Sequence, residues 1–306
     1  MNGSRPLISL ALFAYQQEEY VRAAVEAALS QSYSPLEVIL SDDASSDRTF
    51  EIMCEVVDTY AGPHTIKLNC NERNLGIAGH VNHVAELASG SVVVLAAGDD
   101  ISLPHRVERI ASAFGQGERI MAVLSGYTAI DPAGTELDTV ALPADFAPFT
   151  ELDSLARSGG WVGMGATLAY ARECFTTPNP IPGQILCEDR ILPFRAALLG
   201  RIAFVREPLV RYRVHDRSMS AEASFKSPEY EAKHQRVLAD ELEWARKSGR
   251  IGERLYRKAK RALNRYPNHF QRALRLSSHP IVAKLYSAFY FRDVWIRRIR
   301  WRISGR

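Results

Sequence analysis

The sequence predicts an α/β fold with a mainly parallel central sheet flanked by helices and a helical, strongly basic C-terminal extension. In the first third of the chain, short apolar runs alternate with segments whose apolar residues recur at helical spacing. This alternation is typical of parallel sheets with right-handed crossovers. Toward the end of the chain, helical spacing persists while Lys and Arg accumulate. We therefore expect one domain over residues 1–220 and an extension over residues 221–306.

Four short apolar runs in the first third are predicted to be strands of this sheet. Strands buried on both faces have nearly continuous apolar sequences. The runs are residues 7–13, 36–40, 65–69 and 91–97. The segments between them have apolar residues three and four positions apart, which indicates amphipathic helices. These helices are expected over residues 21–29, 49–60 and 77–88.

The second part of the domain is predicted to be less regular. A helix is expected from Pro104 to about residue 114, and another, opened by acidic residues, over residues 190–199. From Ser227 the pattern is helical, with interruptions near three helix-breaking positions, Gly249, Pro267 and Pro280. Further strands are expected over residues 120–127, 167–171, 202–205 and 209–214.

The net charge of +3 conceals a strong asymmetry along the chain. Residues 1–243 hold 20 Lys and Arg against 33 Asp and Glu, whereas residues 244–306 hold 18 against 2. A basic tail indicates nucleic acid or an anionic membrane as partner. No nucleic-acid-binding motif accompanies it, so we expect no nucleic acid. Apolar residues four apart among arginines instead favour an interfacial helix on anionic lipid, with a solvated, packed helix face as the alternative. They are Phe291, Trp295, Ile299 and Ile303.

Cysteine usage and hydropathy indicate the cellular compartment. The four cysteines form no C-x-x-C pair, which indicates reduced, buried thiols in a cytosolic protein. The apolar residues 7–15 favour a buried first strand over a signal peptide. No stretch approaches the roughly 20 apolar residues of a membrane span. We therefore expect a cytoplasmic protein, with its tail allowing a peripheral position at the inner face of the cell membrane.

Three pairs of adjacent carboxylates mark the candidate site. Two of them follow predicted strands, so in a parallel sheet both lie at the carboxyl edge, where ligands bind. Carboxylate pairs there require a proton, a hydrogen-bonding ligand or a cation, and a divalent metal carrying a diphosphate meets this need. Neither G-x-G-x-x-G nor a Walker motif is present, which excludes a Rossmann dehydrogenase or P-loop enzyme. The pairs are Asp42-Asp43, Asp99-Asp100 and Glu188-Asp189.

Six motifs, taken in order, resemble those of bacterial family 2 glycosyltransferases. The resemblance covers about residues 7–220. It implies an inverting enzyme of hexosyltransferase type with the GT-A nucleotide-diphospho-sugar transferase fold. The motifs are Phe-Ala-Tyr-Gln-Gln-Glu at 13–18, Ile-Leu-Ser-Asp-Asp-Ala-Ser-Ser-Asp at 39–47, Asn-Glu-Arg-Asn-Leu-Gly at 71–76, Leu-Ala-Ala-Gly-Asp-Asp-Ile-Ser-Leu-Pro at 95–104, Glu-Asp at 188–189 and Glu-Pro-Leu-Val-Arg-Tyr-Arg-Val-His at 207–215.

The resemblance implies roles for individual residues by position. Asp189 matches the general base, with Glu188 beside it. The residues that match the nucleotide-binding positions are Tyr15 and Asp43, which hold the base and ribose, and Asp42 and Arg73, which assist.

The resemblance also implies a divalent metal, Mn²⁺ or Mg²⁺, on the diphosphate. Asp99 matches the last carboxylate of the family's D-x-D motif, and it also belongs to the nucleotide site. The first position of that motif is Ala97 here, so metal binding rests on Asp99 with Asp100 or a water completing the shell. His215, at the end of the last motif, is expected on the phosphate and metal side.

Three further side chains are candidates for contacts with the acceptor or with phosphate. Arg211 and Arg213 follow the same late strand, and their guanidinium groups suit phosphate; a surface basic cluster is the alternative. Trp161 lies in a glycine-rich loop and offers an apolar face to a sugar ring. A core tryptophan is the alternative reading for that residue.

Together these observations predict a metal-dependent transfer of a sugar from a nucleotide-sugar donor, first a UDP-sugar, to an acceptor hydroxyl. A single displacement needs a base for the hydroxyl proton and stabilisation of the leaving diphosphate. The expected acceptor is a saccharide or a lipid-linked molecule in cell-surface polysaccharide or lipid-linked oligosaccharide biosynthesis. Two alternatives stay open: a non-catalytic sugar-nucleotide binding module, suggested by Ala97, and a metal-dependent nucleotidyltransferase.

Overall fold

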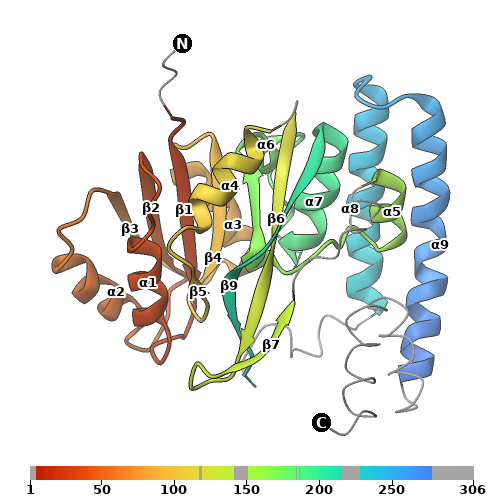
Figure 1. The fold of residues 1–306 in the computed structure, drawn as a ribbon. Coiled ribbons are helices and arrows are strands. Elements are labelled where there is room, and N and C mark those ends of the chain that lie inside the picture. Colours follow the sequence, from red (N-terminus) through yellow and green to blue (C-terminus); the bar gives the residue numbers. More distant parts are fainter. Residues whose placement is uncertain are drawn as a thin grey trace, which may run out of the picture.

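The structure is a computed structural model that describes residues 5–116, 119–140, 151–183, 185, 187–215 and 228–277. A central sheet is covered by helices on both faces, and a pair of long helices stands at one side (Figure 1). The predicted α/β class is confirmed.

The strands follow the order of the chain. They are β1 (Ile8–Ala14), β2 (Leu36–Asp42), β3 (Thr65–Cys70), β4 (Val92–Ala97), β5 (Ile101–Ser102), β6 (Ile120–Ile130), β7 (Glu136–Val140), β8 (Leu168–Ala171) and β9 (Arg201–Arg213). The helices are α1 (Val21–Leu29), α2 (Thr49–Asp58), α3 (Gly76–Leu87), α4 (Arg106–Phe114), α5 (Leu152–Arg157), α6 (Glu173–Thr176), α7 (Glu188–Leu199), α8 (Pro228–Lys247) and α9 (Glu253–Ser277), with the 3₁₀ turn η2 (Gly165–Thr167).

The sheet has the strand order β3-β2-β1-β4-β8-β6-β9-β5, with β7 beside β6. Strands β3, β2, β1 and β4 are parallel, β8 runs antiparallel to β4 and β6, and β6 and β9 are parallel. The register pairs Ala14 with Asp42 and Phe13 with Ala97, so β1, β2 and β4 end at one edge. The predicted mainly parallel sheet is therefore confirmed, and the first two acidic pairs share that edge.

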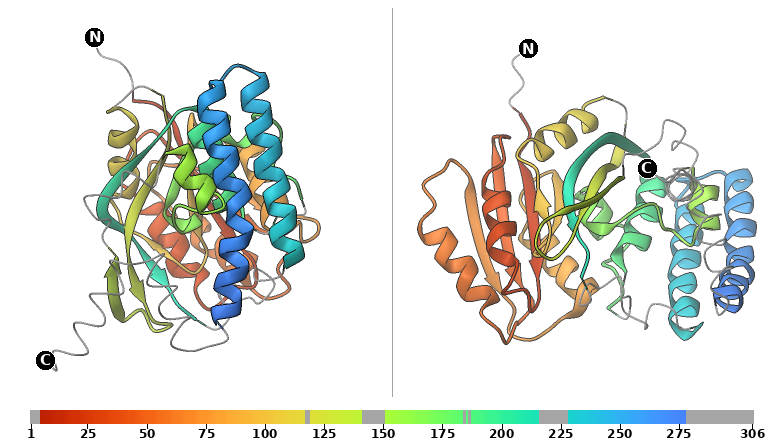
Figure 2. Two further views of the ribbon diagram at one scale, coloured as in Figure 1. Left: turned by 90° about the vertical axis from the view of Figure 1, so that its right-hand side faces the viewer. Right: turned by 60° about the horizontal axis from the view of Figure 1, so that its bottom comes forward.

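Two buried apolar clusters hold the sheet between its helices. Successive residues of β1 enter opposite clusters, Leu10 and Leu12 on one face and Ala11 on the other, as the two-residue period of a strand requires. The first face is covered by α1, α2 and α4. The second is covered by α3, α5, α6, α7, α8 and α9, with Leu238 of α8 and Leu263 of α9 in its core. Figure 2 shows α8 and α9 side by side along this flank.

The C-terminal helices therefore share the hydrophobic core of the sheet. The expected domain boundary at residue 220 lies outside the described residues, as does the predicted amphipathic segment of the tail. Within the described part of the chain, no helix is long and apolar enough to cross a membrane.

Several local predictions are wrong in detail. Two expected strands around Pro208 form the single strand β9, because irregular register beside Gly126 of β6 accommodates the proline. Helix α9 continues past Pro267, although Gly249 separates it from α8 as expected. Packing of α9 against α5 and α8 outweighs the loss of one backbone donor at the proline. Pro280 lies outside the described residues.

The short elements α5, α6, β5 and β7 had no clear sequence signal. All four cysteines are free, as expected, but only Cys174 is buried. Cys70 is exposed because it ends β3, the edge strand of the sheet.

Candidate active site

The loops that follow β1 and β2 are joined by side-chain hydrogen bonds to backbone amides. The Gln16 N–H donates to Ser45 Oγ at 2.8 Å and the Gln17 N–H donates to Thr49 Oγ1 at 2.8 Å. Gln16 has a φ of 54°, in the left-handed region that turns the chain sharply after β1. This turn leaves Tyr15 45% exposed at the carboxyl edge, available to a ligand.

Asp42 and Asp43 are both buried, and their oxygens are bonded within the loops. Asp43 accepts hydrogen bonds from Asn71 Nδ2 at 2.7 Å, the Leu75 N–H at 2.9 Å and the Gly76 N–H at 3.0 Å. Asp42 accepts from the N–H and the hydroxyl of Ser45. Asp43 thereby fixes the loop of residues 71–76 and the start of α3.

Arg73, in that loop, is exposed and has no ion pair with any residue in the described ranges. The loop that carries Arg73 is bonded to Asp43 at the edge where Tyr15 lies, and Arg73 has no carboxylate partner in the described structure.

A buried polar network beneath Asp43 was not predicted from the sequence. His80 Nε2 lies 2.6 Å from Ser41 Oγ, which also accepts from Asn69 Nδ2 at 2.9 Å. Asn69 Nδ2 in turn donates to Asn71 Oδ1 at 2.9 Å. Burial lowers the pKa of His80, against the opposing charge of Asp43. The only sequence signal was the position of His80 on the apolar face of α3.

Asp99 and His215 meet across the sheet from distant parts of the chain. His215 Nε2 lies 3.0 Å from Asp99 Oδ2, and the two side chains are 9% and 14% exposed. The Tyr20 ring lies 5.0 Å from the His215 ring. The predicted metal-side residues Asp99 and His215 are thus brought together.

Asp100 and Arg213 form the support behind that pair. The Arg213 N–H donates to Asp100 Oδ1 at 2.8 Å, and Asp100 Oδ2 is buried without a hydrogen-bond partner in the described structure. Burial, followed by the charge of Asp99, raises the pKa of Asp100 well above its ordinary value. The Arg213 guanidinium donates to the carbonyls of Asp99, Asp131 and Pro132 at 2.8, 3.1 and 2.7 Å.

Arg211, Arg213 and Trp161, the residues predicted to contact phosphate or the acceptor, differ in how exposed they are and in their partners. The donors of Arg213 are engaged with backbone carbonyls, and the side chain is buried. Arg211 is exposed and lies 3.3 Å from Glu136 Oε1, a weak surface pair. Trp161 is half-buried in its loop, and its carbonyl accepts from Ser158 Oγ at 2.7 Å.

Arg106 is the functional candidate that sequence reasoning missed. Its side chain is fully buried, and its Nη2 donates to the carbonyls of Leu95 at 2.8 Å and Ala166 at 2.7 Å. Burial lowers its pKa to about 10, and the charge of Asp100 acts in the opposite direction. Arg106 therefore links β4, which leads to Asp99, to the η2 turn beside the third acidic pair.

That third pair, Glu188 and Asp189, opens α7. A Cβ at Gly165 would lie 2.5 Å from Glu188 Oε1, so only glycine allows η2 to approach this closely. Burial raises the pKa of Glu188 to about 8, and the charge of Asp189 acts in the same direction. Burial raises the pKa of Asp189 to about 6, limited by the charge of Arg190 and a hydrogen bond from the Gly165 backbone. One carboxyl of the pair is thus protonated at neutral pH while the other is ionised.

Comparison with known families decides the class. Residues 9–142 match the model of glycosyl transferase family 2. The chain carries a family 2 glycosyltransferase domain of the bacterial type. It is a glycosyltransferase, as the resemblance implied. The match covers the loops after β1 and β2 and the Asp99 turn, whereas the Glu188-Asp189 pair lies beyond it.

Relatives and solved structures agree with this assignment. A protein of Nostoc sp. described as an uncharacterized glycosyltransferase is 27% identical over 74% of this chain and 71% of its own length. EpsE of Bacillus subtilis, named as a glycosyltransferase, is 33% identical over 43% of this chain and 47% of its own length. The chain thus spans about half of EpsE.

Solved structures of glycosyltransferases share the fold. S. aureus TarS residues 1–349 in complex with UDP superposes with a TM-score of 0.64 at 18% identity, over 86% of this chain and 72% of TarS. The mannosyltransferase PcManGT of Pyrobaculum calidifontis, solved with GDP-Man and Mn²⁺, gives 0.57 at 16% identity, over 96% and 83%. The fold expected from the resemblance, GT-A, is therefore confirmed.

Proposed function

We propose that this glycosyltransferase is an inverting enzyme that uses Asp189 as its general base. The observation that carries the proposal is the ionisable pair at the start of α7, where the pKa of Asp189 is about 6 and that of Glu188 is about 8. A general base works best when its pKa lies close to the working pH, and Asp189 meets this condition. The protonated neighbour Glu188 spares the site a second negative charge.

The reaction follows from this arrangement as a single displacement. The acceptor hydroxyl oxygen forms a bond to the anomeric carbon of the donor, and its proton passes to Asp189. The bond from that carbon to the diphosphate oxygen breaks, and the nucleoside diphosphate leaves. Arg106 holds the Ala166 carbonyl against β4, so the base and the Asp99 turn keep a fixed relation during the transfer.

The donor is proposed to bind at the carboxyl edge of β1, β2 and β4. Tyr15 and Asp43 hold the base and ribose, with Asp42 and Arg73 assisting. A UDP-sugar is the first candidate donor, supported by TarS structures solved with UDP and with UDP-GlcNAc. PcManGT was solved with GDP-Man, so a GDP-sugar is the next to test.

Asp99 and His215 are proposed to hold a divalent metal, Mn²⁺ or Mg²⁺, on the diphosphate. No group of three or more metal-ligating side chains occurs in the described ranges, so oxygens of the donor would complete the shell. The oxygen and nitrogen donors 3.0 Å apart fit Mn²⁺, a metal that accepts both. A bound metal would stabilise the leaving diphosphate as a Lewis acid. Asp100, buried behind Asp99, would support the turn.

The acceptor is proposed to be a saccharide or lipid-linked molecule of cell-surface polysaccharide or lipid-linked oligosaccharide synthesis. Trp161 would offer a face to the acceptor sugar, and Arg211 a charge to an acceptor phosphate. We place the enzyme at the inner face of the cell membrane, attached peripherally through its basic tail.

A screen of nucleotide sugars tests the proposal. Because a bound ligand stabilises the native protein, a donor at 100 times its Kd raises stability by about 2.7 kcal/mol. The expected result is metal-dependent stabilisation by one nucleotide sugar, release of nucleoside diphosphate with an acceptor, and a product of inverted anomeric configuration. Stabilisation without turnover would favour a binding module. Pyrophosphate released from a nucleoside triphosphate would favour a nucleotidyltransferase.

A further inference from the structure

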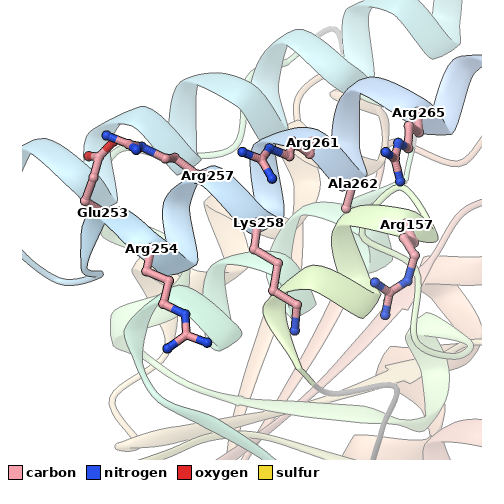
Figure 3. Close-up of a pocket in the computed structure, with 8 residues that line it drawn as sticks. All are labelled: Arg157, Glu253, Arg254, Arg257, Lys258, Arg261, Ala262 and Arg265. Carbon is pink, nitrogen blue, oxygen red and sulfur yellow. The ribbon is translucent and has the colours of Figure 1, made fainter.

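A groove lined by cations lies between α9 and α5, on the flank formed by the C-terminal helices. Its volume is about 680 Å³, and it is open to solvent along α9 (Figure 3). One acidic side chain, Glu253, stands at its end. The cations are Arg157, Arg254, Arg257, Lys258, Arg261 and Arg265.

Half of the six cations of this groove have a carboxylate partner: Arg157 and Lys258 pair with Asp153 at 2.6 and 3.2 Å, and Arg257 pairs with Glu253 at 2.7 Å. On the sheet side, Arg22 pairs with Glu55, Arg48 with Glu51 at 2.8 Å, and Arg109 with Glu207 at 3.0 Å. In the groove, three exposed arginines of α9 have no carboxylate within 4.0 Å among the described residues. These are Arg254, Arg261 and Arg265.

We propose that this groove docks on anionic phospholipid headgroups, which deepens the membrane contact of the proposed function and rests on it. The spacing of Arg254, Arg261 and Arg265 places their charges along one face of a helix, which suits a surface rather than a single small anion. The chain after α9, residues 278–306, adds seven Lys and Arg against one Asp.

Vesicle co-sedimentation of the full-length protein tests this docking. The triple variant R254Q/R261Q/R265Q is compared with R22Q/R48Q/R109Q, which changes the net charge equally. On vesicles of equal parts phosphatidylglycerol and phosphatidylethanolamine, we expect the groove variant to bind roughly 100-fold more weakly and the control variant to bind almost as wild type. Neither should sediment with phosphatidylcholine vesicles.

Equal binding by the two triple variants would overturn the docking proposal. So would unchanged vesicle binding combined with slower transfer to a soluble polyanionic acceptor, which would assign the groove to the acceptor. Because vesicle binding is measured without donor or turnover, its failure leaves the transferase proposal untouched.

A second, independent observation concerns the contact between α8 and the start of α7. Arg190, the neighbour of Asp189, is buried and donates from both Nη atoms to Glu231 of α8 at 3.0 and 2.8 Å. Its Nε donates to the Gly159 carbonyl at 3.0 Å. A Cβ at Gly160 would lie 2.0 Å from the Arg190 carbonyl, so the glycine loop fits tightly against this residue.

Among the titratable and charged groups around Asp189, Arg190 is the one that favours its ionised form. Glu188 and Cys187 precede it on the chain, Tyr170 faces the pair from β8, and burial raises the pKa of each of these three groups. On α8, burial lowers the pKa of His234 well below its ordinary value, so this imidazole is neutral at physiological pH. Glu231, also on α8, is paired with Arg190. The guanidinium of Arg190 is therefore the cation that favours the ionised form of Asp189.

We propose that Arg190 is a positioning residue: by anchoring the first turn of α7 to Glu231 of α8 and to the Gly159 carbonyl, it sets the place of its chain neighbour Asp189 for proton transfer. The proposal rests on the assignment of Asp189 as the base. It gives α8 a role in catalysis, although α8 lies outside the family match.

A second ion pair between the same two helices provides a matched control. Arg195 of α7 is 1% exposed and bonds to Glu241 of α8, and its Nη1 donates to the Cys174 carbonyl at 2.8 Å. Arg195 lies on α7 six positions after Asp189, so this ion pair anchors a later turn of the helix. Removal of either arginine leaves a buried carboxylate unpaired, so both changes should lower the melting temperature.

The test compares the pH dependence of kcat/KM for R190M and R195M in the full-length enzyme. For R190M we expect the acidic limb to move to higher pH by about one unit, because the cation favouring the carboxylate is gone. R195M should keep the wild-type limb, and R190K, which retains a cation, should restore most of the shift. Wild-type limbs in folded R190M would overturn the positioning role. An active D189N variant would instead overturn the base assignment itself.

Discussion

The Asp42-Asp43 pair and the Glu188-Asp189 pair hold their carboxylates in opposite ways. On the donor side, Asp43 accepts three hydrogen bonds from the loop that it fixes, and Asp42 accepts two from Ser45. On the proposed acceptor side, burial outweighs the hydrogen bonds to the carboxylates and raises the pKa of Glu188 to about 8 and that of Asp189 to about 6. The hydrogen bonds to Asp42 and Asp43 fix the loops around them, whereas burial of Glu188 and Asp189 favours their protonated forms. This difference agrees with the proposed roles, donor binding for the first pair and proton transfer for the second.

Substitution of Asp189 by Asn should have the largest effect on activity. The amide keeps the size of the side chain but cannot accept the acceptor's proton, so kcat should fall by about 10³-fold. Donor binding, followed by thermal stabilisation, should stay within about twofold. The exposed Asp58 at the end of α2 gives the control variant D58N, which should behave as wild type. Equal turnover by D189N and wild type would place the base elsewhere.

Substitution of Asp43 by Ala should affect folding as well as donor binding. It leaves the side chain of Asn71 and the backbone N–H groups of Leu75 and Gly76 without their acceptor. Lost hydrogen bonds to a charged group destabilise, so the free energy of unfolding should fall by about 3 kcal/mol. The donor KM should rise by roughly tenfold or more with a smaller change in kcat. Urea unfolding and initial rates measure the two effects, and a normal donor KM in folded D43A would contradict the binding role.

The sheet was predictable because its signal is local. The runs that became β1, β2 and β4 are buried on both faces, so their apolar residues are almost continuous in sequence. The position of Asp42 and Asp99 at one edge followed from parallel pairing alone. Helix α5 was not predicted, because a helix of six residues is too short for its apolar periodicity to be recognised in the sequence.

The contacts that assemble the site join residues far apart in the chain, so no pattern in the sequence predicts them. Asp99 and His215 are 116 positions apart, and only a family resemblance suggested that they belong together. Arg106 was not predicted from the sequence, because its role depends on hydrogen bonds from its buried guanidinium to two backbone carbonyls. Arg213 was predicted to contact phosphate, but its guanidinium donates hydrogen bonds to backbone carbonyls of the protein.

Substitution of His215 by Ala tests the proposed metal site on the donor side. If Asp99 and His215 hold the metal together, loss of the imidazole should raise the Mn²⁺ concentration for half-maximal activity about tenfold. His105 offers a matched control, because its Nε2 lies 2.9 Å from the Glu207 carboxylate on the surface. The H105A variant should keep the wild-type metal dependence. An unchanged Mn²⁺ requirement in H215A would remove His215 from the proposed shell.

The smallest expected effect is on the pH dependence of the free energy of unfolding, through Glu188 and Asp189. The pKa of Glu188 is raised from an ordinary 4.5 to about 8 in the folded protein, so the folded state binds more protons than the unfolded state between these values. Stability contributed by protonated Glu188 is therefore complete below about pH 4.5 and is lost as the pH rises toward about 8. Asp189, raised from 3.8 to about 6, acts in the same direction at lower pH.

The variant E188Q, which cannot ionise, should remove the part of this loss that Glu188 causes. Relative to wild type, its free energy of unfolding should rise by roughly 1–2 kcal/mol between pH 6 and pH 8. The comparison variant E241Q removes a buried carboxylate that is paired with Arg195, and it should lower the free energy of unfolding because Arg195 loses its partner. Parallel pH curves for E188Q and wild type would mean that Glu188 is already ionised near neutral pH. The contrast between the donor-side and acceptor-side carboxylates would then not hold for Glu188.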